Sequence, residues 1–314
     1  MQTQLGRKKI IVIMMGMLFI LEMNGCNFNK PDKIPQDKLK PTPNLNKSSV
    51  NAGERGNSEH PYGKSFKGIL PWENNPRFKT LIAGKNMKVR MAAFQTTLPD
   101  PLPGEESNVA RAADFLAGKI VKPGEVFSMN HTIGPYSKTR GFRDGPAYYG
   151  AEIVKVTGGG VCKIASTLYN VTTLANLKII ERNPHSMPVP YVPPGQDATV
   201  ASSNKDFRFM NNSSGPILIW ADTKRNTLYM AIYGGTKPPK VTWRHKILSR
   251  KPTRTFYRKN GNLRFGEEKT VIPGADGLVV KSWLAIKYSN GRIEYKNLGV
   301  DHYNPLPHVI EKGY

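Results

Sequence analysis

The most restrictive feature of this sequence is a series of short apolar or alternating segments in its second half. Residues 206–235 contain three of them, DFRFMNN, GPILIWAD and TLYMAIYGG, with the turn-forming stretches NSSG and TKRN between them. Runs of this length, bounded by glycine, asparagine and serine, are typical of strands joined by hairpins. We therefore expect an antiparallel meander in this part of the chain.

Two earlier segments have the pattern of helices instead. Ser107 is expected to cap a helix over residues 107–117, before a Pro-Gly turn leads into a strand. In residues 161–177, apolar side chains recur at helical spacing from Ile164 onwards and predict a buried face. The sequence thus predicts an α+β core over residues 68–236, with two main helices and a C-terminal antiparallel meander.

The N-terminus has the pattern of an export signal. A basic head precedes an apolar run over residues 10–21, which is shorter than the roughly 20 residues that a spanning helix needs. Gly25 before Cys26 resembles the lipobox of bacterial lipoproteins, in which the cysteine is lipidated, although polar residues precede Gly25. We interpret residues 1–26 as a signal peptide with lipidation at Cys26; an uncleaved signal anchor is the alternative. Either one places the rest outside the cytoplasm, tethered to the membrane.

Composition then limits the partners. Residues 27–67 are rich in Asn, Lys, Pro, Ser and Gly and predict a disordered basic tether. The whole chain has 46 Lys and Arg against 23 Asp and Glu, a net charge of +23. Such an excess outside the cell favours polyanions, namely acidic lipid headgroups or anionic wall polymers. Export argues against nucleic acid as the partner.

Residues 237–314 form a second region with its own pattern. They read as strands around the turns KNGN, IPGADG and YSNG, and predict a small all-β module. The module opens with basic residues and no acidic one: Lys240, Arg244, Lys246, Arg250, Lys251, Arg254, Arg258 and Lys259.

The stretch TGGGVCKIASTLYN places Cys162 at the start of the second predicted helix. Free N–H groups and the helix dipole stabilise an anion there and lower the pKa of a thiol, and Lys163 adds a positive charge. Gly158, Gly159 and Gly160 permit positive φ angles and close approach of a substrate backbone, and their N–H groups would suit an oxyanion hole. These residues are therefore candidates for a nucleophile and a substrate-binding turn.

A second interpretation of the same cysteine stays open. If Cys26 carries lipid, Cys162 has no disulfide partner within the chain. Three alternatives then remain for Cys162: an intermolecular disulfide, a buried inert thiol or a reactive thiol. A cysteine at a buried helix start is often a small apolar residue, and three glycines can simply form a tight turn.

A nucleophilic thiol also needs a base. His185 lies beyond the second helix and can return to its start, with Asp197 or Asp206 to orient the imidazole. His131 is a second candidate base. The sequence contains no CxxC, HxxxH or comparable ligand spacing, so we expect neither a metal nor a cofactor.

Four segments resemble the VanW family, in the order that the family has them: KPGEVFSMNHTIGPYSKTRGF, GGGVCKIASTLYN, RNPHSMPVPYVPPGQDATV and DFRFMNNSSGPILIWA. The resemblance extends over residues 89–235. The segment from residue 266 onwards is similar to the glycine-patterned β modules that follow this domain in relatives and occur in wall-binding enzymes. The family usually has glutamine after the cysteine, where this chain has Lys163, which puts any role of that glutamine in doubt here.

The resemblance implies a Gram-positive envelope protein but no established activity. Two functions remain. One is thiol-dependent cleavage or transfer at peptidoglycan stem peptides, as in a cysteine peptidase or transpeptidase. The other is a non-catalytic wall-binding or scaffold protein, which needs only the charge excess and the β module. Whether the chain is an enzyme depends on Cys162.

Overall fold

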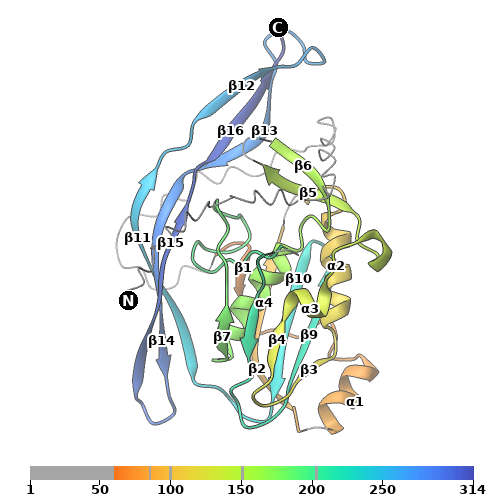
Figure 1. The fold of residues 1–314 in the computed structure, drawn as a ribbon, viewed down its shortest axis with the longest axis vertical. Helices are drawn as coiled ribbons and strands as arrows, with labels where there is room; N and C mark the ends of the chain where they lie inside the picture. The colour runs from red at the N-terminus through yellow and green to blue at the C-terminus, as the bar shows by residue number, and fades with distance from the viewer. Residues whose placement is uncertain (1–59, 85, 99–100, 150–151, 202–203) are drawn as a thin grey trace, which may run out of the picture. The chain divides into compact units, whose positions relative to one another are not determined.

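The computed structural model describes residues 60–84, 86–98, 101–149, 152–201 and 204–314 (Figure 1). The predicted signal peptide, the lipidation at Cys26 and most of the predicted tether lie outside these residues. In the described part, no helix is long and apolar enough to cross a membrane.

The core is built on a five-stranded antiparallel sheet in the order β1-β2-β10-β9-β3. β9 and β10 form the hairpin that the sequence predicts. β1 pairs with β2 and precedes Gly68, so ordered structure begins before the expected start of the core. The strands are β1 (Gly63–Ser65), β2 (Val89–Thr97), β3 (Lys119–Val121), β9 (Ile217–Lys224) and β10 (Thr227–Gly234).

Both faces of this sheet are covered. Alternate residues of β9 point to opposite sides, so Ile217 and Ile219 pack with α2 and α4, while Leu218 and Trp220 pack with α1. Burial on both faces explains why the β9 segment is continuously apolar. The helices are α1 (Pro76–Gly84), α2 (Glu105–Leu116), α3 (Met129–Ile133) and α4 (Cys162–Leu174), with a 3₁₀ turn, η3 (Lys138–Arg140).

Two details differ from the sequence prediction. The first of the two predicted helices is α2, which begins at Glu105 after Gly104. The acidic Glu105 and Glu106 lie in its first turn, so Ser107 is not its cap. The first strand of the predicted meander, β8, pairs with β4 and β7 rather than with β9. The apolar pattern identified the strand but not its distant partners.

Two smaller sheets complete the core. One has the order β4-β8-β7, and the other is the hairpin β5-β6, which the sequence analysis did not predict. Their strands are β4 (Val126–Ser128), β5 (Asp144–Tyr149), β6 (Glu152–Thr157), β7 (Lys178–Glu181) and β8 (Arg208–Met210).

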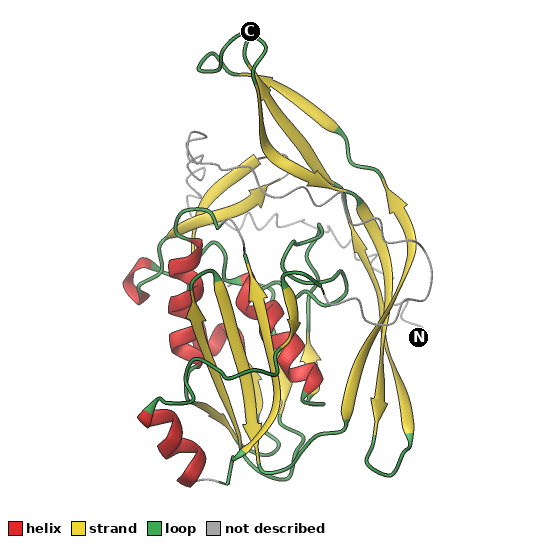
Figure 2. Cartoon of the chain, turned by 180° about the vertical axis from the view of Figure 1, so that it is seen from behind, coloured by secondary structure: helices red, strands yellow, loops and turns green. Residues whose placement is uncertain are grey.

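The C-terminal residues consist of strands without helices, as Figure 2 shows. They form the sheets β11-β14-β15 and β12-β16-β13, and only β12 and β16 pair in parallel. Over the described residues the protein is mostly β, with 44% strand, four α-helices and several antiparallel sheets. The strands are β11 (Lys240–Lys251), β12 (Thr255–Lys259), β13 (Glu268–Ala275), β14 (Gly277–Lys287), β15 (Ile293–Tyr303) and β16 (Leu306–Lys312).

Candidate active site

Cys162 is the first residue of α4, as the sequence predicts. Its side chain is half-buried, and its Sγ lies 3.2 Å from Thr199 Oγ1 and 3.6 Å from the carbonyl oxygen of Val200. Within the described residues the thiol is free of any disulfide. The sulfur therefore sits between the start of α4 and the loop that follows residue 193.

The glycine run forms the turn before α4, and the protein's own packing requires it. Gly158 and Gly160 have positive φ angles of 83° and 98°, which are unfavourable for any residue that has a side chain. A Cβ on Gly159 would collide with the backbone of Gly145 at the start of β5. Buried Asn108 of α2 fixes this turn by donating to the carbonyl of Gly159 at 2.9 Å. The glycines thus bring the chain close to itself, and their role in substrate binding stays a prediction.

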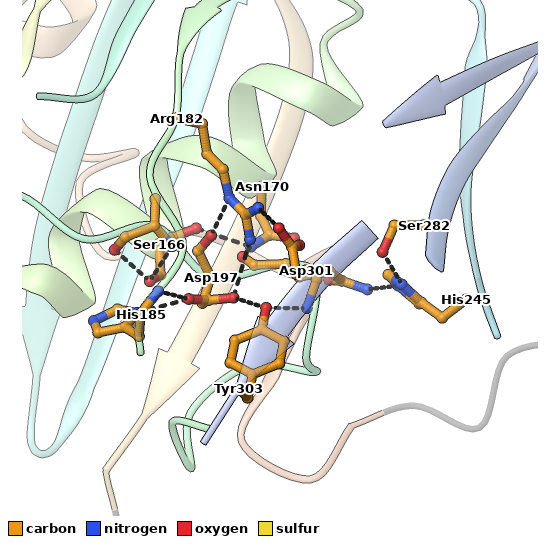
Figure 3. A network of polar contacts seen from close by, with 12 residues as sticks. Ser166, Asn170, Arg182, His185, Asp197, His245, Ser282, Asp301 and Tyr303 are labelled. Carbon is orange, nitrogen blue, oxygen red and sulfur yellow. Dashed lines mark hydrogen bonds and ion pairs between the residues drawn. The ribbon is translucent and has the colours of Figure 1, made fainter. Parts of the chain in front are cut away.

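His185 and Asp197 meet next to the thiol, although 23 residues of sequence separate Cys162 from His185. Asp197 Oδ2 accepts from both the ring Nδ1 and the backbone N–H of His185, each at 2.7 Å (Figure 3). Because Nδ1 is engaged, Nε2 is the nitrogen left to interact with the thiol, which raises the pKa of His185. The structure therefore brings together the predicted nucleophile, base and orienting carboxylate.

The electrostatics of the three groups favour a charged pair. Burial raises the pKa of the Cys162 thiol, but the hydrogen bond and charge of His185, with Thr199 and Val200, outweigh burial and lower it. Burial lowers the pKa of His185, but Asp197 and Cys162 raise it to about 9. Burial raises the pKa of Asp197, whereas His185 and Arg182 bring it down to about 2. A lowered thiol pKa and a raised imidazole pKa both act towards an imidazolium–thiolate pair.

Lys163 does not act on the thiol as expected. It is buried, with 4% of its surface exposed, and its Nζ donates to the carbonyl of Asn226 at 3.2 Å. Burial lowers the pKa of Lys163 to about 8, against the opposing effect of Glu105. Lys163, Glu105 and Asn226 line a cavity of about 320 Å³ whose described lining does not include Cys162.

The two alternative site residues lie elsewhere. His131 is an exposed residue of α3, whereas His185 lowers the pKa of the thiol. Asp206 accepts from the Ser128 hydroxyl and from the Asn130 N–H, so it holds the start of α3. Asp197, not Asp206, orients His185.

Several residues that support the site were not singled out from the sequence. Ser166 and Asn170 follow Cys162 at intervals of four residues, so they share its face of α4. Ser166 Oγ accepts from the N–H of Ala198 at 2.9 Å, and Asn170 Nδ2 donates to the carbonyl of Gln196 at 2.7 Å. Their spacing of four from Cys162 was the available signal. Among the described residues, no group of His, Cys, Asp and Glu could hold a metal ion.

The comparisons with known proteins match the region that contains these residues. The model of the family described as "VanW like protein" matches residues 104–233. Uncharacterized protein YoaR of Bacillus subtilis (strain 168) is 37% identical over 126 residues, which are 40% of this chain and 42% of that protein. Vancomycin B-type resistance protein VanW of Enterococcus faecalis (strain ATCC 700802 / V583) is 26% identical over 136 residues, 42% of this chain and 50% of that protein. The matches thus span half or less of these relatives.

Two solved structures are also similar in part. The IgA1 protease G5 domain is 17% identical, covers 26% of this chain and 98% of its own, and has a TM-score of 0.16. The G5 domain of HP0197 is 16% identical, covers 24% and 99%, and has a TM-score of 0.14. Scores this low do not establish a common fold. The sequence matches do identify the core: residues 104–233 form a VanW-like domain.

Proposed function

We propose that the chain is a thiol-dependent acyl-transfer enzyme of the cell envelope that acts on amide bonds of peptidoglycan stem peptides. The observation that carries the proposal is the 2.7 Å contact between His185 Nδ1 and Asp197, beside a thiol whose pKa is lowered. A cysteine that only fills space has no need of an oriented imidazole. The envelope location and the stem-peptide substrate rest on the family and on the export pattern.

In the reaction, the Cys162 thiolate attacks the carbonyl carbon of the amide. The first-turn N–H of Cys162 has no backbone acceptor among the described residues and would stabilise the oxyanion. His185 then gives its Nε2 proton to the leaving amine as the C–N bond breaks, which leaves a thioester on Cys162. Water or a second amine, deprotonated by His185, attacks the thioester and restores the thiolate.

Mass spectrometry of muropeptides tests the proposal. Purified peptidoglycan is incubated with the full chain or with the Cys162→Ala variant, and the released and remaining stem peptides are compared. New or lost fragments that depend on Cys162 are the expected result. Identical profiles from two folded proteins would exclude this activity.

The pH dependence of cleavage is a separate prediction. Because the pKa of His185 is raised to about 9, its proton is available to the leaving amine below that pH and is lost above it. We expect kcat/KM to decline above about pH 9. A rate that keeps rising towards pH 10, as for an unassisted thiol, would contradict the assigned role of His185.

A second function, wall binding, has its own supporting observation on the sheet β11-β14-β15. Residues that lie opposite each other in neighbouring strands of this sheet point to the same face. The face that contains Lys246 and Lys281 has no acidic residue. Tyr295 is 70% exposed on it. Basic and aromatic side chains together suit an anionic glycopolymer. Other residues of this face are Lys240, Arg244, Lys246, Lys281, Trp283, Lys287, Ile293 and Asn297.

The binding prediction uses paired charge removals. Lys246 and Lys281 are cross-strand partners, and replacing both by glutamine should weaken retention on isolated walls about threefold to tenfold, since each exposed contact contributes about 0.2–1 kcal/mol. Added salt should weaken the wild type in the same direction. The control replaces Lys79 and Lys88, which are exposed in the core region, and so changes the net charge equally. Equal effects of the two pairs, or retention that salt leaves unchanged, would reject this face as the binding surface.

A further inference from the structure

The loop that carries Asp197 is held on two sides. On one side, Ser166 and Asn170 of α4 bond the backbone of residues 196 and 198. On the other side lie β11, β14 and β15, which come after the end of the matched family domain at residue 233. The second set of contacts joins the Asp197 loop to the C-terminal sheet.

Tyr303, the last residue of β15, contacts this loop twice. Its hydroxyl accepts from the N–H of Gly195 at 2.7 Å and donates to Asp197 Oδ1 at 2.5 Å (Figure 3). Only 5% of Tyr303 is exposed, and burial, together with the Asp197 charge, raises the pKa of its phenol. Tyr303 therefore stays a neutral donor to the carboxylate that orients His185.

Asp301, two residues earlier in β15, acts through Arg182. Arg182 Nη1 donates to Asp301 Oδ1 at 2.6 Å, while its Nη2 donates to Asp197 Oδ1 at 3.1 Å. The Nε of the same guanidinium donates to the backbone carbonyl of Asp197 at 2.7 Å. The guanidinium is planar and rigid, so fixing one end on Asp301 sets the position of the other end on Asp197.

β11 and β14 hold the residues next to Asp197. His245 Nε2 accepts from Gln196 Nε2 at 2.9 Å, and its Nδ1 lies 3.0 Å from Ser282 Oγ. Burial, with a smaller effect of Arg182, lowers the pKa of His245 to about 4, so the imidazole is neutral and able to accept. Gly195 has φ of 90°, and a Cβ there would collide with Ser282 Oγ. The loop and the C-terminal sheet are thus in direct contact.

We infer that the C-terminal sheet completes the active site, with Tyr303 and Asp301 as positioning residues that fix Asp197 and, through it, His185 against the thiol. The inference rests on the proposed function and deepens it, because it makes residues outside the family domain part of the catalytic apparatus. The proton donors on Asp197 come from both parts: His185 and Arg182 from the core, and Tyr303 from the sheet.

The test measures the reactivity of Cys162 without any substrate. The full chain is alkylated with iodoacetamide across a pH series, and the peptide that contains Cys162 is quantified by mass spectrometry. In Tyr303→Phe, Asp197 loses a donor and Gly195 loses its acceptor, so the imidazolium is held less firmly against the thiolate. We expect the pH midpoint to rise by about one unit, which lowers the alkylation rate below the midpoint about tenfold.

The matched control is Tyr257→Phe, the same change at an exposed position of β12, which should leave the midpoint unchanged. Asp301→Asn is the second variant, with a smaller upward shift expected, and it decides the question if Tyr303→Phe fails to fold. Folded variants with the wild-type midpoint would overturn the inference and leave the proposed function standing. If alkylation of Cys162 in the wild type had the ordinary thiol midpoint of about 8.5, both the inference and the proposed function would be overturned.

Discussion

Cys162→Ser is expected to lower the rate of stem-peptide cleavage at least about a thousandfold, because removing the nucleophile of a catalytic set that acts as a unit removes nearly all of its acceleration. The fold should persist, since serine is close in size and the side chain is only half-buried. The measurement is initial product formation by wild type and variant at equal concentration.

Cys26→Ser provides the matched control for this experiment, because it makes the same substitution at the other cysteine of the chain. Purified Cys26→Ser should cleave at the wild-type rate. If the folded Cys162→Ser variant retained more than about a tenth of the wild-type activity, the thiol would not be the nucleophile. A tenfold loss of rate is far smaller than the loss caused by removing a catalytic nucleophile.

Asp197→Asn should have the second-largest effect, on both activity and stability. The two oxygens of Asp197 accept from four donors: the N–H and Nδ1 of His185, Arg182 Nη2 and the Tyr303 hydroxyl. Asparagine has one oxygen, so its NH₂ must face two of these donors. The misplaced imidazole should cost on the order of a thousandfold or more in kcat.

The same substitution removes one of the two carboxylates that pair with the buried Arg182 and leaves only Asp301 as its charged partner. The side chains of Arg182 and Asp197 are 12% and 1% exposed, and breaking a buried pair of this kind costs about 3–5 kcal/mol. Because the pKa of Asp197 is depressed to about 2, its contribution is present above the ordinary carboxyl range and is lost as the pH falls through 2. The stability gap between wild type and variant should therefore persist at neutral pH and close only in strong acid.

Urea unfolding measures the cost, and Asp114→Asn is the control. Asp114 also pairs with an arginine, Arg111, but the two side chains are 71% and 40% exposed. Losing that exposed pair should cost less than about 1 kcal/mol. Equal losses in the two variants would mean that the buried network around Asp197 contributes no special stability.

The sequence predicted local features of this protein well. The α4 pattern, the β9–β10 hairpin and the position of Cys162 at a helix start all follow from short-range periodicity and turn residues. The spacing of four that aligns Ser166 and Asn170 with Cys162 is present in the sequence, but it did not lead to a prediction for these two residues. What periodicity cannot show is the pairing of β8 with β4 and β7, because strand partners far apart in sequence are chosen by packing.

The same limit applies to the site. His185 and Asp197 were predicted as base and orienting residue from the chemistry that a thiol needs, and the structure places them in contact. The contacts of Arg182 with Asp301 and of Tyr303 with Asp197 join residues more than 100 positions apart. Arg182, directly after β7, and Tyr303, at the end of β15, carry no local signal that they share a carboxylate.

The central claim is that Cys162 is an activated thiol rather than a packing residue, and the pH dependence of its alkylation in the wild-type chain tests this most directly. The account predicts a midpoint below the ordinary thiol value of about 8.5, and a shift back towards that value in His185→Ala. A wild-type midpoint at or above about 8.5, unchanged by His185→Ala, would contradict it and identify Cys162 as structural.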